Sequence, residues 1–288
     1  MVWGMRRLLA ATLSVSLLAV LAAAMTAVLM QLAPGFYTDE AELNPTYGGA
    51  VQIRLQDQQR NGPGALWRTA AILTGWTHLD FGRSRTWDVP VSEIVRSRVH
   101  SSVRLLFRAL CMSWLIASAA ALVWSSRQRP LYEASVTLIA AGALATPAGV
   151  LATLCILTGR GGPVLVITVL LSARIFRFLR GLLQEAWKAP HVIAARGFGL
   201  SSVRIFARGV WPQLLPQIPP LAGMSLMIAL AALVPVEVLF DQPGLGKLAW
   251  QATTNRDLPV LLAVTLLFAG AILAAGTLLN SRLHVIQP

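Results

Sequence analysis

The stretch EAWKAPHVIAARGFGLSSVRIFARGVWPQLLP occupies residues 185–216, and the organisation of the chain is worked out from it. It is the longest polar, basic interruption in the second half of a very apolar sequence. Charged residues at this density are too costly for a membrane span. A soluble loop without a partner leaves the Arg196-Gly197-Phe198-Gly199 core unexplained. We therefore predict a cytoplasmic segment that docks on another protein.

The composition predicts a membrane protein. The 288 residues are 56% hydrophobic and 12% charged, whereas a soluble domain carries roughly twice that charged fraction. The apolar residues form blocks long enough to cross a bilayer, which takes about 20 residues each. The net charge of +12 comes from Arg residues dispersed at the ends of these blocks. That distribution follows the positive-inside tendency and argues against a nucleic-acid surface.

Apolar blocks predict an all-α integral membrane protein with six transmembrane helices and both termini in the cytoplasm. The blocks are residues 8–33, 103–124, 134–157, 164–178, 218–240 and 259–279. The first block could begin as a signal peptide does, but it continues without a polar cleavage region, so we predict an uncleaved helix. The predicted parts are 1–33 (N-terminus and first helix), an external segment 34–102, and a core 103–288. The core includes the cytoplasmic loop 181–216 and an external segment 241–258.

Several single features carry smaller predictions. Trp67, Trp76 and Trp87 in the external segment indicate packing at the membrane interface, with ligand stacking as the alternative. Asp88-Val-Pro90-Val-Ser-Glu93 predicts a helix entry with an early acidic residue. Pro147 in the third block indicates close packing or a kink. Arg174, Arg177 and Arg180 share one helical face, which favours a lipid-headgroup anchor over a substrate role. Cys111 and Cys155 are interpreted as small buried hydrophobic residues.

The 185–216 stretch predicts a short helix–turn–helix. Gly197 and Gly199 permit a tight turn, and Ser201 or Ser202 can cap a helix from Val203 to Val210. We expect that helix to have an apolar face (Val203, Phe206, Ala207) and a basic face (Arg204, Arg208). Pro212, Pro216, Pro219 and Pro220 are expected to stop and restart the chain before the fifth span. An amphipathic helix on lipid is the alternative, but it would not need paired glycines.

This stretch resembles the cytoplasmic loop of the inner-membrane permease subunits of ABC importers, of the dipeptide, oligopeptide and nickel class. The matching residues there are Glu185, His191-Val192 and Ala194-Ala195-Arg196-Gly197-Phe198-Gly199-Leu200-Ser201. Further matches, in order along the chain, are Ala33–Gly35, Asp80–Ser84, Val89–Val91, Val236-Glu237, Phe240, Pro243–Gly246 and Arg256–Pro259. The chain departs from the family at His191, commonly Tyr, at Phe198, commonly basic, and at Phe36-Tyr37, usually Asp and Pro.

The resemblance implies a type I ABC importer permease fold in the bacterial cytoplasmic (inner) membrane. It implies no catalytic residue, metal or cofactor in this chain, with ATP and Mg bound by partners. Those partners would be a second homologous permease subunit, two ATPase subunits, an external substrate-binding protein and the lipid bilayer. The implied ATPase-coupling residues are Glu185, His191, Ala194, Ala195, Arg196, Gly197, Gly199, Ser201 and Arg204. Gly199 would matter because a Cβ could obstruct the close turn, so we expect Gly199→Asp to abolish transport.

A second set of residues is expected at the translocation path or at the contact with the binding protein. These are Glu237, Asp241, Pro243, Gly244, Gly246, Arg256 and Asp257. Glu237 lies near the outer end of the fifth span, where an ionisable residue is a functional candidate; a structural hydrogen bond is the equal alternative. The substrate stays open among peptides, nickel chelates, opines and sugars, all carried by permeases of this pattern.

Other function classes need features that the sequence does not offer. A secondary, ion-coupled transporter would need internal repeats or ionisable residues at mid-membrane. An intramembrane enzyme would need a nucleophile–base pair or a metal cluster, and both Gly-x-Ser-x-Gly and His-Glu-x-x-His are absent. A membrane scaffold without transport activity is the remaining alternative.

Overall fold

The computed structural model describes residues 81–84, 86–125, 141–142 and 145–280, together with 17, 21, 24–26, 28 and 29. Within these residues the regular elements are helices, and strand pairing is limited to one isolated bridge between Arg83 and Pro90. The all-α prediction is confirmed for this part of the chain. Most of the predicted external segment, including Trp67 and Trp76, lies outside the described residues.

Backbone contacts divide the chain into two units. The first comprises Met1–Arg98 and Leu248–Gly270, and the second comprises Val99–Lys247 and Ala271–Pro288. Helices α5 (Val91–Ser125), α13 (Leu245–Thr254) and α14 (Leu258–Asn280) each contribute residues to both units.

Helix α5 begins at Val91 with Glu93 in its first turn, which confirms the predicted helix entry after Asp88. The helix starts twelve residues before the apolar block at 103, because the polar residues that precede this block are also helical. In the second unit its inward face carries small residues four apart, namely Ala109, Ser113, Ala117 and Ala121, all buried. Such spacing allows close helix contact within a membrane. The outward face is apolar and exposed, through Phe107, Leu115, Ile116 and Leu122.

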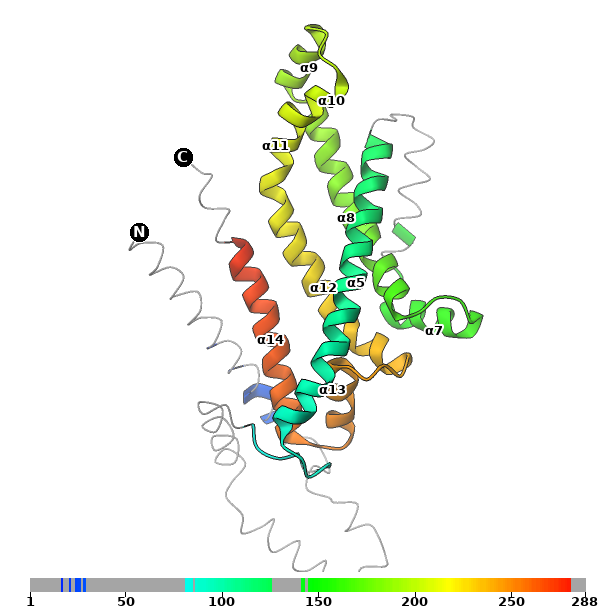
Figure 1. Cartoon of the computed structure of the whole chain (residues 1–288), viewed down its shortest axis with the longest axis vertical. Helices are drawn as coiled ribbons and strands as arrows, with labels where there is room; N and C mark the ends of the chain where they lie inside the picture. Colours follow the sequence, from blue (N-terminus) through cyan, green and yellow to red (C-terminus); the bar gives the residue numbers. More distant parts are fainter. Residues whose placement is uncertain are drawn as a thin grey trace, which may run out of the picture. The chain divides into compact units, whose positions relative to one another are not determined.

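Helices α8 (Pro163–Trp187) and α12 (Ile218–Leu239) pack along α5 in the second unit (Figure 1). Ser113 Oγ donates to the carbonyl of Ala109 at 2.5 Å and approaches that of Thr168, on α8, at 3.5 Å. On the α12 side, the indole N–H of Trp114 donates to Ser225 Oγ at 3.3 Å. These bonds satisfy polar groups that would otherwise lie unpaired among apolar side chains.

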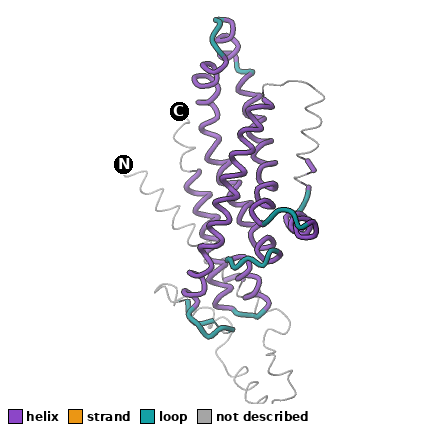
Figure 2. Tube along the Cα trace, turned by 45° about the vertical axis from the view of Figure 1, so that its right-hand side comes forward, coloured by secondary structure: helices purple, strands orange, loops and turns teal. Residues whose placement is uncertain are grey.

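Helix α7 (Ala148–Thr158) runs crosswise to α8 and α12 in Figures 1 and 2. Pro147 is the residue immediately before it, with an extended backbone. The predicted kink is therefore a full break, and the span predicted over 134–157 is not one continuous helix. Cys155 on α7 is half-buried, and Cys111 on α5 is exposed; both are free thiols. The expectation of a buried side chain is therefore wrong for Cys111, which lies on the outward face of α5.

Two helical runs in the described residues are long and apolar enough to cross a membrane. They are Val91–Trp124, of 34 residues, and Ser202–Leu239, of 38 residues. Ala148–Thr158 and Leu258–Leu273 are apolar but shorter. The spans predicted at 103–124 and 218–240 are thus present as long apolar helices, whereas six spans are not confirmed by the described residues. Helix α8 continues nine residues beyond its predicted end and contains Arg174, Arg177 and Arg180.

The run from Ser202 to Leu239 is helical throughout. It consists of α10 (Ser202–Ile205), a π-helical turn η1 (Phe206–Val210), α11 (Trp211–Leu214), a 3₁₀ turn η2 (Leu215–Gln217) and α12. The expectation that four prolines stop and restart the chain is wrong. Prolines stand at the first or second position of α11, η2 and α12, where a missing backbone N–H is tolerated.

Candidate functional site

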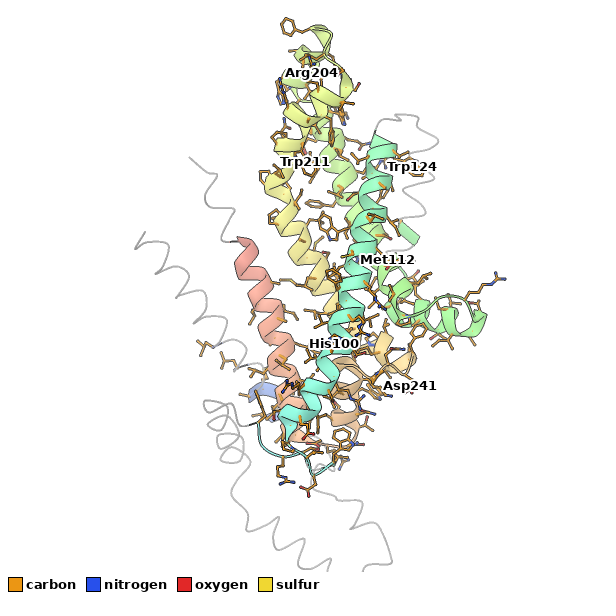
Figure 3. All side chains as sticks on the ribbon, in the orientation of Figure 1. His100, Met112, Trp124, Arg204, Trp211 and Asp241 are labelled. Atoms are coloured by element: carbon orange, nitrogen blue, oxygen red, sulfur yellow. The ribbon has the colours of Figure 1, made fainter. Side chains whose placement is uncertain are left out.

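A helix–turn–helix lies at one end of the second unit, as predicted from residues 185–216. Helix α8 ends at Trp187, Ala189 is extended, and α9 (Pro190–Gly197) begins with Pro190 at its first position. An extended residue before a proline is sterically favoured, so the chain turns here. In Figure 3 Arg204 marks this end of the unit, and Asp241 marks the opposite end.

The turn after α9 is closed by a Schellman motif. The N–H of Leu200 donates to the carbonyl of Ala195 at 3.3 Å, and the N–H of Gly199 donates to that of Arg196 at 3.0 Å. This pattern requires a left-handed residue just past the helix end, and Gly199 has φ +73°. A Cβ on Gly199 would meet nothing within 4 Å in this chain. Backbone conformation, rather than the crowding that we expected, therefore constrains this position.

Gly197 does not take part in the turn. It is the last residue of α9, and a Cβ there would also meet nothing within 4 Å. The expectation that both glycines are needed for the turn is therefore wrong, because Gly199 alone makes it. Ser201 stands at the N-cap of α10, but its hydroxyl makes no capping bond; its carbonyl accepts from Ile205 at 3.0 Å.

Helix α9 packs on the π-helical turn through its first half. Val192 is fully buried, and a Cβ on Gly209 would lie 3.4 Å from a methyl group of Val192. His191 Nε2 lies 2.6 Å from Gln213 Nε2, a second link between α9 and the run toward α12. Ile205 and Val210 are buried, whereas Val203 is 80% exposed. The apolar face predicted through Val203 and Ala207 is thus wrong: the buried residues are Ile205 and Val210, which are five positions apart, the spacing that a π turn brings into line.

The second half of α9 is held by aromatic rings. The guanidinium carbon of Arg196 lies 5.0 Å from the ring centroid of Trp187, within the range of a cation–π contact. Trp187 stacks on Phe206 with centroids 6.4 Å apart, and Phe206 lies 6.2 Å from Trp211. These four residues, here called the aromatic relay, come from α9, α8, η1 and α11.

The tip of the helix–turn–helix is apolar and basic. Ile193 is 59% exposed, Phe198 85% and Val203 80%. The exposed or partly exposed cations around them are Lys188, Arg196, Arg204 and Arg208. No carboxylate occurs in the sequence between Glu185, exposed on α8, and Glu237. Ala194 is exposed and Ala195 half-buried. Large exposed apolar side chains in one place mark an interaction surface, and this one suits an acidic partner.

The second predicted set is centred on Glu237, at the other end of α12. Its carboxylate is fully buried. Oε1 accepts from Ser102 Oγ at 2.6 Å, and Oε2 accepts from the backbone N–H groups of Gly246 at 2.7 Å and Lys247 at 3.2 Å. Ser102 Oγ in turn accepts from the N–H of Leu245 at 2.7 Å. Glu237 and Ser102 thereby bind N–H groups of the first turn of α13, where a negative charge is also favourable.

Two predicted glycines make room for this arrangement. A Cβ on Gly244 would overlap the carboxylate of Glu237, and one on Gly246 would lie 2.8 Å from the backbone of Val234. Pro243 is exposed beside them. The Pro243-Gly244-Leu245-Gly246 sequence thus lets the chain close tightly over the end of α12.

Asp241 is exposed and forms an ion pair with Lys247. The hydrogen bond and charge of Lys247 lower the pKa of Asp241 below its ordinary value of 3.8. Since the carboxylate is solvated, screening keeps such a pair weak.

The remaining predicted residues lie in the first unit. Asp257 is fully buried; its Oδ2 accepts from Ser84 Oγ and from the N–H of Thr86 at 3.2 Å. Within the described residues, its Oδ1 accepts no hydrogen bond. Arg256 is exposed, with φ +56°. The Asp80–Ser84 and Arg256–Pro259 matches, far apart in the sequence, therefore meet through Ser84 and Asp257.

The structure brings Glu237, Gly244 and Gly246 together, with Asp241 beside them, and keeps them at the opposite end of the second unit from the helix–turn–helix (Figure 3). Sequence reasoning missed Ser102 and Trp187, and it placed Phe206 only on an apolar helix face. Ser102 gives no signal in the sequence, since its partner is 135 positions away. Trp187 gives none either, because Phe198 lies nearer to Arg196 along the chain.

Comparisons with known proteins agree on one family. A family model described as "Binding-protein-dependent transport system inner membrane component" matches residues 113–288. The oligopeptide transport system permease protein OppB of Escherichia coli is 25% identical over 261 residues, covering 83% of this chain and 84% of that protein. The nickel import system permease protein NikB of Staphylococcus aureus is 25% identical over 284 residues, covering 91% and 84%.

Proposed function

The chain belongs to the family of binding-protein-dependent transport system inner membrane components, and we propose that it is the permease subunit of an ATP-driven importer. It would form half of a translocation path, with a second homologous permease subunit forming the other half. As a transport permease it is not itself an enzyme; ATP and Mg would be bound by two separate ATPase subunits. The proposed location is the bacterial inner membrane, with both termini in the cytoplasm.

One observation carries the proposal beyond family membership: the helix–turn–helix at 190–205. Its Schellman turn fixes an exposed tip of Ile193, Phe198 and Val203, and the sequence has no carboxylate between Glu185 and Glu237 to pair with the cations of α9 and α10. An amphipathic projection of this kind fits a groove on a partner. We assign the ATPase subunit as that partner, with an apolar groove and an acidic rim.

Coupling would then be mechanical. When ATP closes the paired ATPase subunits, the docked α9 is displaced with them. The displacement reaches α8 through the chain and the run Ser202–Leu239 through α10 and the π turn. The two permease subunits would thereby alternate between inward-facing and outward-facing states.

The cargo is proposed to be a peptide or a similar small solute, delivered by an external binding protein. OppB and NikB are named for oligopeptides and nickel, so both kinds of solute are offered in the test described below. At the external end, the Glu237 turn and α13 would face the path or the binding protein. The hydrogen bonds of Glu237 favour a structural role for that carboxylate over a role in substrate binding.

The test is reconstitution with the partners encoded beside the chain. The permease pair and the ATPase subunits are placed in vesicles, with binding protein and labelled oligopeptide or nickel supplied outside. We expect uptake that requires both ATP and the binding protein. Uptake driven by a proton or sodium gradient without ATPase subunits would instead establish a secondary transporter. Complex formation with no uptake of any offered solute would support a scaffold.

A further inference from the structure

Three helical elements meet at the ring of Trp187. Trp187 is the last residue of α8, and its ring lies between Arg196 of α9 and Phe206, the first residue of the π turn. Phe206 in turn contacts Trp211, the first residue of α11. The ring of Trp187 therefore joins α9, α8 and the run toward α12, in addition to the contacts that His191 and Val192 make from the first half of α9.

The π turn creates this alignment. Residues five apart in an α-helix point about 140° away from one another. In the π turn the N–H of Trp211 instead bonds to the carbonyl of Phe206, an i→i+5 bond that brings these two residues in line. Their rings consequently lie 6.2 Å apart. Short π segments of this kind occur frequently at functional sites.

Arg196 has no competing partner in the described part of the chain. No carboxylate there lies within ion-pair distance of it, and the sequence has none between Glu185 and Glu237. The guanidinium instead lies over the face of Trp187 at 5.0 Å. Because the first half of α9 is held by Val192 against Gly209, the Arg196–Trp187 contact is what fastens its second half.

We propose that Trp187 is a positioning residue for energy coupling: it makes α9, α8 and the Ser202–Leu239 run move as one body. This inference rests on the proposed function, since it assumes that α9 is the element displaced by the ATPase subunits. Without the Trp187 ring, the second half of α9 is attached by the chain alone. An ATPase subunit could then displace the second half of α9 while both long helices follow less, because only the contacts of Val192 and His191 in the first half still transmit the movement.

The experiment measures solute transported per ATP hydrolysed in the reconstituted complex. We expect Trp187→Leu to assemble with ATPase subunits and to hydrolyse ATP, while transport per ATP falls about threefold, the scale of a lost solvent-exposed cation–π contact. Trp187→Phe retains a ring for both contacts and is expected to restore most of the ratio. Arg196→Gln should lower the ratio, and the Trp187→Leu/Arg196→Gln double variant should be no worse than Trp187→Leu alone.

Trp124→Leu is the matched control. Trp124 makes an edge contact with Phe176 at 6.5 Å in the same unit but does not touch α9, so its loss should leave the ratio unchanged. A wild-type ratio in Trp187→Leu would overturn the proposal. If that variant fails to assemble, Arg196→Gln decides, and a wild-type ratio there overturns it equally. Absence of ATP-dependent uptake in the wild type would count against the proposed function and not against the role proposed for Trp187.

Discussion

The carboxylate of Glu237 occupies the space that a side chain at position 244 would need. Glu237 is buried at the end of α12, and the chain returns over it to begin α13. The glycine and the carboxylate are therefore one structural feature, in which neither residue can be changed without affecting the other.

Gly244→Ala tests that relationship. The added methyl group must displace a buried, hydrogen-bonded carboxylate, so we expect a loss of about 1–3 kcal/mol in the free energy of unfolding. Thermal unfolding of the purified complex measures it. Glu237→Ala removes the obstacle, so the double variant should be no less stable than Glu237→Ala alone. Gly181→Ala on α8, with nothing within 4 Å of its Cβ position, is the control; equal midpoints for both alanines would refute the prediction.

Ser102→Ala should destabilise the same turn. It removes a donor from Glu237 and leaves the buried N–H of Leu245 without its acceptor, a loss of about 1–3 kcal/mol. The unfolding midpoint again measures this loss. Ser92→Ala, at an exposed serine of the same helix, is the control. A midpoint equal to that of the control would show that a different group serves Leu245.

Position 199 is constrained by its backbone, and this separates it from position 197. Gly199→Ala must hold a left-handed conformation at a cost of about 1–2 kcal/mol, whereas Gly199→Asn should lose less because asparagine tolerates that conformation. We expect Gly197→Ala to be neutral. The measurement is the amount of ATPase subunit that co-purifies, followed by uptake. Gly199→Asp should insert in the membrane and lose transport; normal uptake by it would contradict the docking role.

Asp257 offers a test of a buried charge. Its Oδ2 accepts two hydrogen bonds, whereas its Oδ1 accepts none from the part of the chain that the structure describes. Asp257→Asn keeps an oxygen for Ser84 and Thr86 while removing the charge, so the unfolding midpoint should stay equal or rise. Asp257→Ala loses both bonds and should cost about 1–3 kcal/mol. A drop in Asp257→Asn as large as in Asp257→Ala would mean that the charge itself is required.

The exposed Asp241–Lys247 pair should have a small, pH-dependent effect. Because the folded pKa of Asp241 is lowered, its contribution is present above the ordinary pKa of 3.8 and is lost as pH falls through the lowered value. Asp241→Asn should therefore differ slightly from wild type at neutral pH and not at all in acid. Unfolding midpoints at both pH values measure this. A difference that grows in acid would reverse the sign and contradict the assignment.

The parts of the fold that sequence could predict are those with local causes. The entry of α5 depends on Asp88–Glu93, and α12 depends on an apolar block. An effect of Pro147 was also predictable, although the structure has a break where a kink was expected. The helix–turn–helix was also predictable, because its glycine and flanking apolar residues are adjacent in the chain.

The parts that could not be predicted depend on distant partners or on register. Ser102 and Glu237 are 135 positions apart, and Ser84 and Asp257 are 173 apart. The π turn brings residues five apart into line, so Val210 is buried together with Ile205, a spacing that an α-helical pattern does not predict. Proline usually interrupts a helix, so the prolines between 212 and 220 suggest breaks in the chain. In the structure they stand at or near the starts of successive helical segments, where a missing backbone N–H is tolerated.

The unbroken helical run from Ser202 to Leu239 has a mechanical consequence. Its 38 residues form a shaft roughly 57 Å long, well beyond the ~30 Å hydrocarbon thickness. Pro212, Pro216, Pro219 and Pro220 in its first half, and Pro235 inside α12, lack backbone N–H donors. Movement applied at the α10 end therefore has to pass through several proline-containing turns before it reaches the Glu237 turn.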